Sequence, residues 1–486
     1  MEMETSISLL DIRPLIPELT LICVGLILLL LDLVVKKKEV VAAAGIVGTL
    51  VALYGTYKLY GFYDAQTAFG GMFILDGYSN FFKLIFYLNV LLTICISFKY
   101  MAIEKASFGE YYALLMFATT GMMIMASAGD LIILYLGLEL MALSTYILAG
   151  LIRRQPRSNE AALKYFFLGA FSSAFLLYGI SLTYGLTGTT NLREIAESLN
   201  TLNIQGSPIM YLGLIFIIVA FGFKIALVPF HMWAPDVYEG APTSITAFMS
   251  VGPKAAGFAV LGRVLFEAFA GMQVQWASIL VPIAILTMAA GSIIALAQTN
   301  IKRMLAYSSI AHAGYILVAM TAGGDMATMS IIYYLMAYTL MNLGAFAIVI
   351  LYGKKGEENI LISDYAGAGF KYPFLSVAMA IFMFSLAGIP PLAGFIGKFY
   401  IFSAAVKQGF IWLAIIGVIN SVIATYYYLR VTVIMYMKEP SKEIGQLSFS
   451  LPMIVALLIT TFFTLHMGIL PERYLQFAKQ SIQMLM

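Results

Sequence analysis

Long apolar stretches alternate with short polar ones along almost the whole chain. A helix of about 20 predominantly apolar residues is long enough to cross a bilayer. Fourteen stretches meet this description, at 15–35, 40–60, 76–100, 108–127, 130–151, 160–184, 209–230, 242–269, 276–299, 303–323, 326–352, 373–407, 411–437 and 450–470. The pattern predicts an all-α polytopic membrane protein with about fourteen transmembrane helices.

Two of these spans contain prolines in their interior. Pro229 lies near the end of the seventh span, and Pro390 and Pro391 lie inside the twelfth. Proline lacks a backbone donor and clashes with the preceding helical turn. The freed backbone groups must then line protein or a water-filled cavity, because lipid cannot bind them. We therefore predict that helices seven and twelve are broken.

The two broken spans also share a lysine and a regular separation. Lys224 lies in the seventh span and Lys398 in the twelfth, five spans later. Such spacing is typical of transporters that are built from internal repeats. Spans 4–8 and 9–13 would be two five-helix repeats, and an odd number of spans per repeat inverts the second one; the alternative is two unrelated kinks. The expected organisation is an N-terminal three-helix segment, a first repeat, a second inverted repeat and a C-terminal helix, at 1–107, 108–270, 271–437 and 438–486.

Composition agrees with a membrane protein, and the position of the charges predicts its orientation. Hydrophobic residues make up 61% of the 486 residues and charged residues only 11%, with a mean hydropathy of +0.91. If the N-terminus is outside, the inner loops hold fifteen lysines and arginines, Lys354, Lys355 and Lys442 among them, and the outer segments hold six. Inner loops carry the excess of basic residues. We expect a multi-pass protein of the bacterial inner membrane with both termini on the outer, periplasmic side.

Seven basic residues fall within the predicted spans. Three lie toward span ends or could reach an interface, which favours structural roles: Lys83, Arg263 and Arg430. The other four lie deeper: Lys164, Lys224, Lys254 and Lys398. Unpaired, each would cost roughly 3 kcal/mol at the bilayer centre. They therefore require a hydrated or paired interior, either as parts of an ion path or as structural cations in internal ion pairs.

Two further titratable groups lie within apolar helices. Glu139 is the clear intramembrane carboxylate, and Lys164 on the next span is its natural partner. The alternative for Lys164 is a pair with Glu160 one turn earlier on its own helix. His312 could exchange protons near neutral pH, or it could be a hydrogen-bonded core residue.

No motif for a bound cofactor is present in the sequence. Cys23 and Cys95 lie far apart and form no CxxC, which excludes a cysteine-ligated iron–sulfur cluster or zinc finger on this chain. His231, His312 and His466 do not match the spacing of a metalloprotease helix. The sequence has no Walker A motif, and no feature predicts nucleic-acid binding. We expect no cofactor and no metal on this chain.

Several stretches resemble a known membrane family. The segment 221–258, FGFKIALVPFHMWAPDVYEGAPTSITAFMSVGPKAAGF, is similar to the core signature of the antiporter-like subunits of respiratory complex I, the NADH-quinone oxidoreductase. The stretches QTNIKRMLAYSSIAHAGYIL (298–317) and SLAGIPPLAGFIGKFYIF (385–402) resemble further signatures of that family. Multisubunit sodium/proton antiporters and membrane-bound hydrogenases belong to the same superfamily. The N-terminal stretches LIPELTLICVGLILLLLDL (15–33) and ILDGYSNFFKLIF (74–86) narrow the resemblance to complex I.

The resemblance implies a fold and a set of roles. The fold is a fourteen-helix unit with two inverted five-helix repeats. By this resemblance Glu139 and Lys164 form a coupling ion pair, and Lys224 is the central proton-handling lysine. Lys254 and His312 belong to a connecting polar axis that ends at Lys398 on the exit side. Because the sequence stops shortly after the fourteenth predicted span, we expect no counterpart of the lateral helix that subunit L carries.

The resemblance also implies an activity that is shared among subunits. This chain would translocate protons, while other subunits carry NAD, FMN, iron–sulfur clusters and quinone. Its expected partners are neighbouring antiporter-like subunits, a small neighbour of the subunit K type, the lateral helix of subunit L and the lipid bilayer. One alternative is a subunit of a sodium/proton antiporter or membrane-bound hydrogenase. The other is a structural scaffold that conducts no ions.

Overall fold

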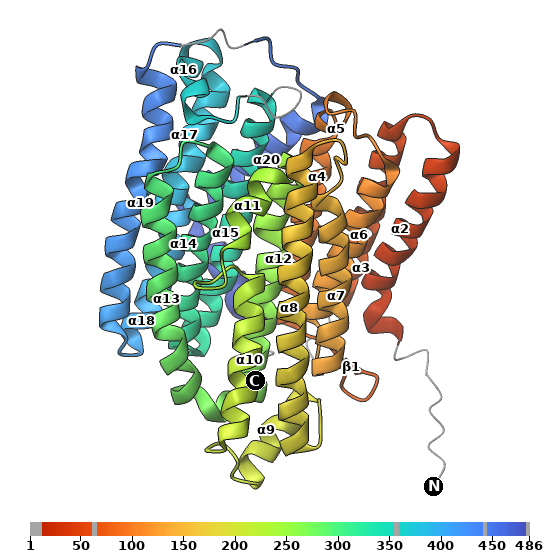
Figure 1. Cartoon of the computed structure of the whole chain (residues 1–486), viewed down its shortest axis with the longest axis vertical. Coiled ribbons are helices and arrows are strands. Elements are labelled where there is room, and N and C mark those ends of the chain that lie inside the picture. Colours follow the sequence, from red (N-terminus) through yellow and green to blue (C-terminus); the bar gives the residue numbers. More distant parts are fainter. Residues whose placement is uncertain (1–11, 61–65, 354–358, 441–444, 483–486) are drawn as a thin grey trace.

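The computed structural model describes residues 12–60, 66–353, 359–440 and 445–482. Long helices run side by side along the long axis of the molecule (Figure 1). Eleven helices in these ranges are long and apolar enough to cross a membrane, and two more apolar helices are shorter. The all-α prediction is confirmed, while the number fourteen stays a prediction. Lys354, Lys355, Lys442 and both chain ends lie outside the described residues.

The elements fall into four consecutive groups. The first contains η1 (Arg13–Leu15), α2 (Ile16–Val34), α3 (Lys38–Tyr60), the antiparallel pair β1 (Gln66–Ala68) and β2 (Phe73–Leu75), α4 (Gly77–Ser97) and α5 (Tyr100–Ile103). The second contains α6 (Gly109–Ala126), α7 (Leu131–Ala149), α8 (Pro156–Thr187), α9 (Leu192–Thr201), α10 (Pro208–Lys224), α11 (Trp233–Gly240), α12 (Thr243–Arg263), a π-helical turn η2 (Val264–Ala268) and η3 (Ala270–Met272).

The third group contains α13 (Gln273–Leu296), α14 (Ile301–Ala322), α15 (Gly324–Tyr352), η4 (Ile362–Tyr365), α16 (Ala368–Lys371), α17 (Pro373–Ala387), α18 (Ala393–Lys407) and α19 (Ile411–Met437). The fourth contains α20 (Leu451–Ile469) and α21 (Pro471–Ile482).

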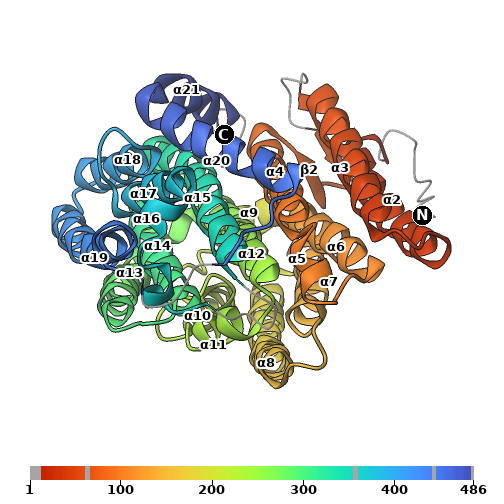
Figure 2. The ribbon, with the colours of Figure 1, turned by 90° about the horizontal axis from the view of Figure 1, so that it is seen from above.

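Helices α12, α14 and α15 occupy the middle of the bundle, with α2 and α3 at one edge and α19 at another (Figure 2). Every residue of α12 is buried, so the charged residues of this helix lie inside protein and not in lipid.

The helical path is interrupted at the two places where prolines occur. Helix α10 ends at Lys224 and α11 begins at Trp233, with Pro229 in the segment between them. The Trp233 indole donates a hydrogen bond of 2.9 Å to the Phe223 carbonyl and so satisfies a group at the broken end. Helix α17 ends before Gly388, which takes a left-handed backbone with φ of 90°. Glycine adopts this conformation without steric cost.

An isolated backbone pairing at the N-cap of a helix, which we call the joint, occurs twice in the described parts of the chain. Asp130 pairs with Asn191, and Asn300 pairs with Leu361, each as an isolated antiparallel bridge. Asp130 caps the start of α7 and Asn300 caps the start of α14, each by accepting a backbone hydrogen bond in the first turn. Asn191 precedes α9 at the lower end of Figure 1, whereas Leu361 precedes η4 and α16 at the upper end. The same joint therefore lies at opposite ends of the bundle.

Candidate functional site

Lys224 lies at the C-terminal end of α10, beside the first interruption. Its side chain is 2% exposed, and its ammonium donates a hydrogen bond of 3.1 Å to the Tyr146 hydroxyl on α7. The same ammonium lies 5.4 Å from the centre of the Tyr146 ring, within the range of a cation–π contact. No acidic residue in the described parts of the chain forms a salt bridge with Lys224. Its charge is therefore stabilised by the hydroxyl and the ring of Tyr146 and by the electrostatic effect of charged groups that it does not touch.

Glu139 is the acidic group that acts on Lys224 through space. It lies on α7 two turns before Tyr146, and its charge affects both Tyr146 and Lys224. The Ser173 hydroxyl on α8 donates a hydrogen bond to one of its carboxylate oxygens. Glu139, Tyr146 and Lys224 thus form one local group in which a carboxylate and an amine influence each other without direct contact.

The expected partnership of Lys164 with Glu139 is wrong in this structure. The Lys164 ammonium contacts Glu160 at 2.7 Å and Asp236 on α11 at 2.9 Å. Its side chain is 41% exposed. The register of α8 explains the difference, because Lys164 precedes Ser173, the contact of Glu139, by two and a half turns, about 13 Å along the axis. The alternative pair with Glu160 is present.

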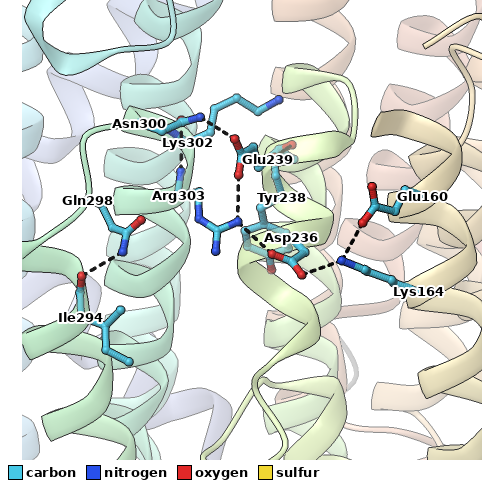
Figure 3. A network of polar contacts seen from close by, with 11 residues as sticks. Glu160, Lys164, Asp236, Tyr238, Glu239, Ile294, Gln298, Asn300, Lys302 and Arg303 are labelled. Atoms are coloured by element: carbon cyan, nitrogen blue, oxygen red, sulfur yellow. Dashed lines mark hydrogen bonds and ion pairs between the residues drawn. The ribbon is translucent and has the colours of Figure 1, made fainter. Parts of the chain in front are cut away.

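Asp236 is the centre of a charged network that joins α8, α11 and α14 (Figure 3). Its second carboxylate oxygen accepts a hydrogen bond of 2.8 Å from Arg303 on α14. The same Arg303 atom also contacts Glu239 at 2.8 Å. A cavity of about 220 Å³ lies among these side chains; we call it the charged cavity, and it is lined by Arg157, Glu160, Lys164, Asp236, Glu239 and Arg303 together with Ala161 and Gly240.

Lys254 and His312 lie deeper, in the centre of the bundle. Lys254 is 3% exposed, and its ammonium donates to the carbonyl and the hydroxyl of Ser309 at 2.9 and 2.7 Å. His312, one turn after Ser309 on α14, bonds the Tyr334 hydroxyl through Nδ1 and the Tyr428 hydroxyl through Nε2. A neutral imidazole has one donor and one acceptor nitrogen. His312 therefore joins α15 and α19 through groups that can exchange a proton.

Lys398 lies beside the second interruption. Its ammonium donates to the carbonyls of Leu386 and Ala387 at the end of α17, both at 3.0 Å, and to the Ser421 hydroxyl at 2.9 Å. It also lies 4.7 Å from the centre of the Tyr315 ring. The last carbonyls of a helix carry partial negative charge, so the broken end of α17 stabilises the cation. A groove of about 810 Å³ between α18 and α19 reaches Lys398.

The six predicted site residues therefore occupy three settings. Lys164 belongs to the charged network and Glu139 shares a local group with Lys224. Lys254, His312 and Lys398 have hydroxyl and carbonyl partners along the central helices. Hydroxyl groups both donate and accept hydrogen bonds. Because these partners separate the titratable groups, the arrangement suits stepwise proton transfer. Among the described residues, Lys164 has direct ion pairs, whereas Lys224, Lys254 and Lys398 have no salt bridge that would fix their protons.

The three basic residues that were assigned to span ends all have polar partners inside the protein, and Lys83 and Arg263 are fully buried while Arg430 is partly buried. Lys83 is 0% exposed and contacts Glu18 on α2 at 2.8 Å. Arg263 makes two hydrogen bonds of 2.9 Å to Asp76. Arg430 donates to backbone carbonyls at the end of α13. The prediction that these residues have structural contacts holds for each, but Lys83 and Arg263 do not reach an interface.

Several residues of the site were not identified from the sequence. Asp236 and Arg303 lie within the quoted signatures, yet nothing in their local pattern connected α11 with α14. Tyr146 could have been found, because it follows Glu139 by two turns on the same face of an apolar helix. Tyr334 and Tyr428 gave no signal, since tyrosine is common in this chain, which has 30. In the described residues no cluster of three or more His, Cys, Asp or Glu side chains could hold a metal ion.

The chain matches a known family of membrane proteins. The family model of the NADH:quinone oxidoreductase/Mrp antiporter transmembrane region matches residues 128–424, which include all six predicted site residues. The chain belongs to this family. It is 48% identical over 478 residues to NADH-quinone oxidoreductase subunit N of Trichlorobacter lovleyi, with 98% of each chain covered. It is 47% identical to subunit N 2 of Rhizobium meliloti, with 96% of each covered.

Two solved structures have the same fold as this chain. A chain of respiratory complex I from Thermus thermophilus matches with a TM-score of 0.79 and 32% identity, covering 95% of this chain and 99% of that one. A chain of an archaeal membrane-bound sulfane sulfur reductase matches with a TM-score of 0.87 at 24% identity, covering 98% of each. The second likeness concerns the fold alone. The chain is thus a multi-pass membrane protein that resembles subunit N of the respiratory oxidoreductase more closely in sequence than it resembles the other complex.

Proposed function

We propose that this chain is the subunit N type, antiporter-like membrane subunit of a proton-translocating NADH-quinone oxidoreductase. Other subunits would hold NAD, FMN, the iron–sulfur clusters and quinone, as the resemblance implies. The chain would contact further antiporter-like subunits, a small subunit of the K type and the lateral helix of subunit L. It would lie in the bacterial inner membrane with both termini on the periplasmic side.

One observation carries the proposal best. Three lysines are buried in the bundle without a salt bridge to any described acidic residue: Lys224, Lys254 and Lys398. A permanent buried charge is costly unless it is paired. Lysine readily gives up its proton when it is buried. These three amines therefore serve as proton carriers more naturally than as structural cations, and the scaffold alternative leaves their cost unexplained.

The repeat organisation supports the same proposal. Two interrupted helical paths each end beside a buried lysine, and the joint between Asp130 and Asn191 recurs as Asn300 and Leu361 at the opposite end of the bundle. We propose an N-terminal segment 1–107, a first repeat 108–270, an inverted second repeat 271–437 and a C-terminal helix 438–486. Inverted repeats place equivalent groups on opposite sides of the membrane, as alternating proton uptake and release requires.

The proposed axis begins at Glu139, continues through Lys224, Lys254 and His312 and ends at Lys398. Loss of negative charge near Lys224 disfavours its protonated form, and gain of that charge favours it. A change around Glu139 in another subunit's reaction cycle would thus move a proton on or off Lys224. Lys164 would act from the charged network, where it balances Glu160 and Asp236.

The test uses the complete complex in sealed vesicles. Lys254→Met keeps the length of the side chain but removes the proton-carrying amine, and we expect it to lower both NADH-driven proton translocation and quinone reduction. Near-normal proton translocation in this variant would contradict the polar axis. Repeating the wild-type assay without sodium separates the alternative, because an obligatory sodium/proton antiporter would stop. Co-purification of flavin and iron–sulfur subunits would exclude an antiporter that lacks them.

A further inference from the structure

One turn of α12 receives hydrogen bonds from three other helices. The Asn89 amide on α4 donates to the Phe248 carbonyl at 3.3 Å. The Tyr238 hydroxyl on α11 donates to the Met249 carbonyl at 3.2 Å. Ser250, the next residue, accepts at its hydroxyl from Asn342 on α15 at 2.6 Å. This turn, Phe248 to Ser250, lies immediately before Lys254.

Pro253 explains why a backbone carbonyl in this turn accepts a hydrogen bond from a side chain of another helix. It lies inside α12, and the backbone of a proline has no N–H to donate to the carbonyl four residues earlier. The carbonyl that loses its helical partner is that of Met249, and Tyr238 supplies the replacement. The turn before Lys254 is therefore a buried polar site, where a backbone carbonyl of α12 is bonded by a side chain of another helix.

Polar residues on α12 form a stripe that ends at Lys254. Thr243, Thr246, Ser250 and Lys254 follow one another at intervals of three or four residues, so they share one face of the helix. All four side chains are buried. The stripe begins at the first residue of α12, three residues after Gly240, which lines the charged cavity. The stripe thus extends along α12 from the neighbourhood of the charged cavity to the central lysine.

The Asn342 side chain has spare hydrogen-bonding capacity at this stripe. It is 0% exposed, and no group in the described parts of the chain donates to its Oδ1. The Oδ1 atom of Asn89, on α4, is in the same situation. Buried amide oxygens are nearly always hydrogen-bonded, and ordered water fills this role where protein does not. Two such oxygens beside one turn mark a place for water inside the bundle.

We propose that protons reach Lys254 directly from the charged cavity, along the polar stripe of α12, with water held by Asn342 next to Ser250 as the last carrier. This inference rests on the proposed proton-translocating function and adds an entry route that bypasses Lys224. At each passage an O–H bond of the water breaks as an N–H bond forms on neutral Lys254, and the water regains a proton from the next donor toward the cavity. Asn342 is a positioning residue in this route, because it holds the carrier and not the proton.

The test compares two buried polar residues on α15 in the assembled complex. Asn342→Leu keeps the side-chain size but removes the water-holding amide. Ser330→Ala is the matched control, since Ser330 is equally buried on the same helix and donates only to its own helix at Ala327. We expect a fall in proton translocation of up to about a hundredfold for Asn342→Leu, the scale on which misplaced reacting groups act, and no change for Ser330→Ala.

A second readout separates a carrier role from a packing role. If proton delivery becomes rate-limiting, the ratio of rates in H₂O and D₂O rises in Asn342→Leu, whereas a packing defect lowers both rates equally. Asn342→Ser, which leaves room for a further water beside Ser250, should restore part of the rate. An unchanged isotope ratio, or no rescue by serine, would overturn the route.

Lys254→Met in the same preparation distinguishes a failure of the route along α12 from a failure of the proposed polar axis. If Lys254→Met loses translocation while Asn342→Leu and Ser250→Ala translocate normally, the route along α12 is wrong and the proposed function stands. If Lys254→Met translocates normally, the polar axis itself is wrong. Loss in all three variants with a raised isotope ratio supports the route.

Discussion

The Lys224 ammonium at the end of α10 donates a hydrogen bond of 3.1 Å to the Tyr146 hydroxyl on α7. This contact connects the broken end of α10 with the helix that carries Glu139. A tyrosine hydroxyl accepts from a charged amine and donates elsewhere once the amine is neutral. Lys224 can therefore change its protonation state without leaving a buried group stranded.

The Glu139 charge is the first element to test. Glu139→Gln keeps the shape of the side chain and its contact with Ser173, but it removes the negative charge that favours protonated Lys224. We expect NADH-to-quinone activity and proton translocation to fall together in a complex that still assembles. Glu110→Gln is the control and should change neither rate, because Glu110 is an exposed residue in the first turn of α6. Wild-type coupling in Glu139→Gln would remove this residue from the axis.

The glycine at the second interruption should matter through Lys398. A methyl group on Gly388 would lie 3.0 Å from Cδ of Lys398, and the backbone has φ of 90°. A left-handed backbone costs a non-glycine residue about 1–2 kcal/mol. Gly388→Ala should therefore lose stability by about that amount, and it should also displace Lys398 from the end of α17 and slow proton translocation.

Gly409 supplies the matched control for this prediction. It has φ of 84°, but no atom lies within 4 Å of the position of an added Cβ. Gly409→Ala should show a similar loss of thermal stability of the complex with normal translocation. Equal translocation in the two alanine variants would show that the position of Lys398 does not depend on Gly388.

The buried pair of Glu18 and Lys83 predicts a stability effect that is separate from the axis. Both side chains are at most 1% exposed, and their charged atoms lie 2.8 Å apart. Lys83→Met strands the Glu18 charge, which should cost about 3–5 kcal/mol. The double variant with Glu18→Gln should recover most of that loss. Thermal dissociation of the subunit from the purified complex measures both, and the exposed Lys58→Met is the control.

Periodicity predicted the fold because the membrane imposes strict rules on it. The length of the apolar stretches predicted most of the helices. Pro229 and Pro390 predicted where the helical path is interrupted, because proline disrupts the helix locally. The partner of Lys164 could not be predicted in this way. Asp236 lies on a short helix after the first interruption, and its position beside α8 depends on how that segment returns to the bundle.

The depth of Lys254 and Lys398 followed from sequence, but their partners did not. Lys254 bonds to Ser309 on α14, and Lys398 bonds to Ser421 on α19 and to carbonyls at the end of the preceding helix α17. Neither serines nor backbone carbonyls stand out in a list of charges. Ser309 was part of a quoted signature, yet its contact with Lys254 arises only where α12 crosses α14. Contacts of this kind depend on packing angles between helices, which hydropathy does not contain.

Substitution of Lys224 separates a proton carrier from a structural cation. If Lys224 is only a buried charge, Lys224→Arg keeps that charge and should largely preserve activity, while Lys224→Ala should not. If Lys224 must release a proton in each cycle, arginine should fail nearly as badly as alanine, because its guanidinium is not deprotonated in proteins. We expect the second result, with proton translocation and NADH-to-quinone activity falling together in an assembled complex.

Lys164→Arg is the matched control for that experiment. Lys164 bonds Glu160 and Asp236 as a cation, and arginine forms such carboxylate pairs at least as well as lysine does. The same substitution should therefore be tolerated at position 164 and fail at position 224, when both variants are measured in sealed vesicles beside the wild type. Because both replacements keep a positive charge, a difference between them isolates the need to release a proton. Near-normal translocation in Lys224→Arg would leave Lys224 as a structural charge and would require the axis to begin elsewhere.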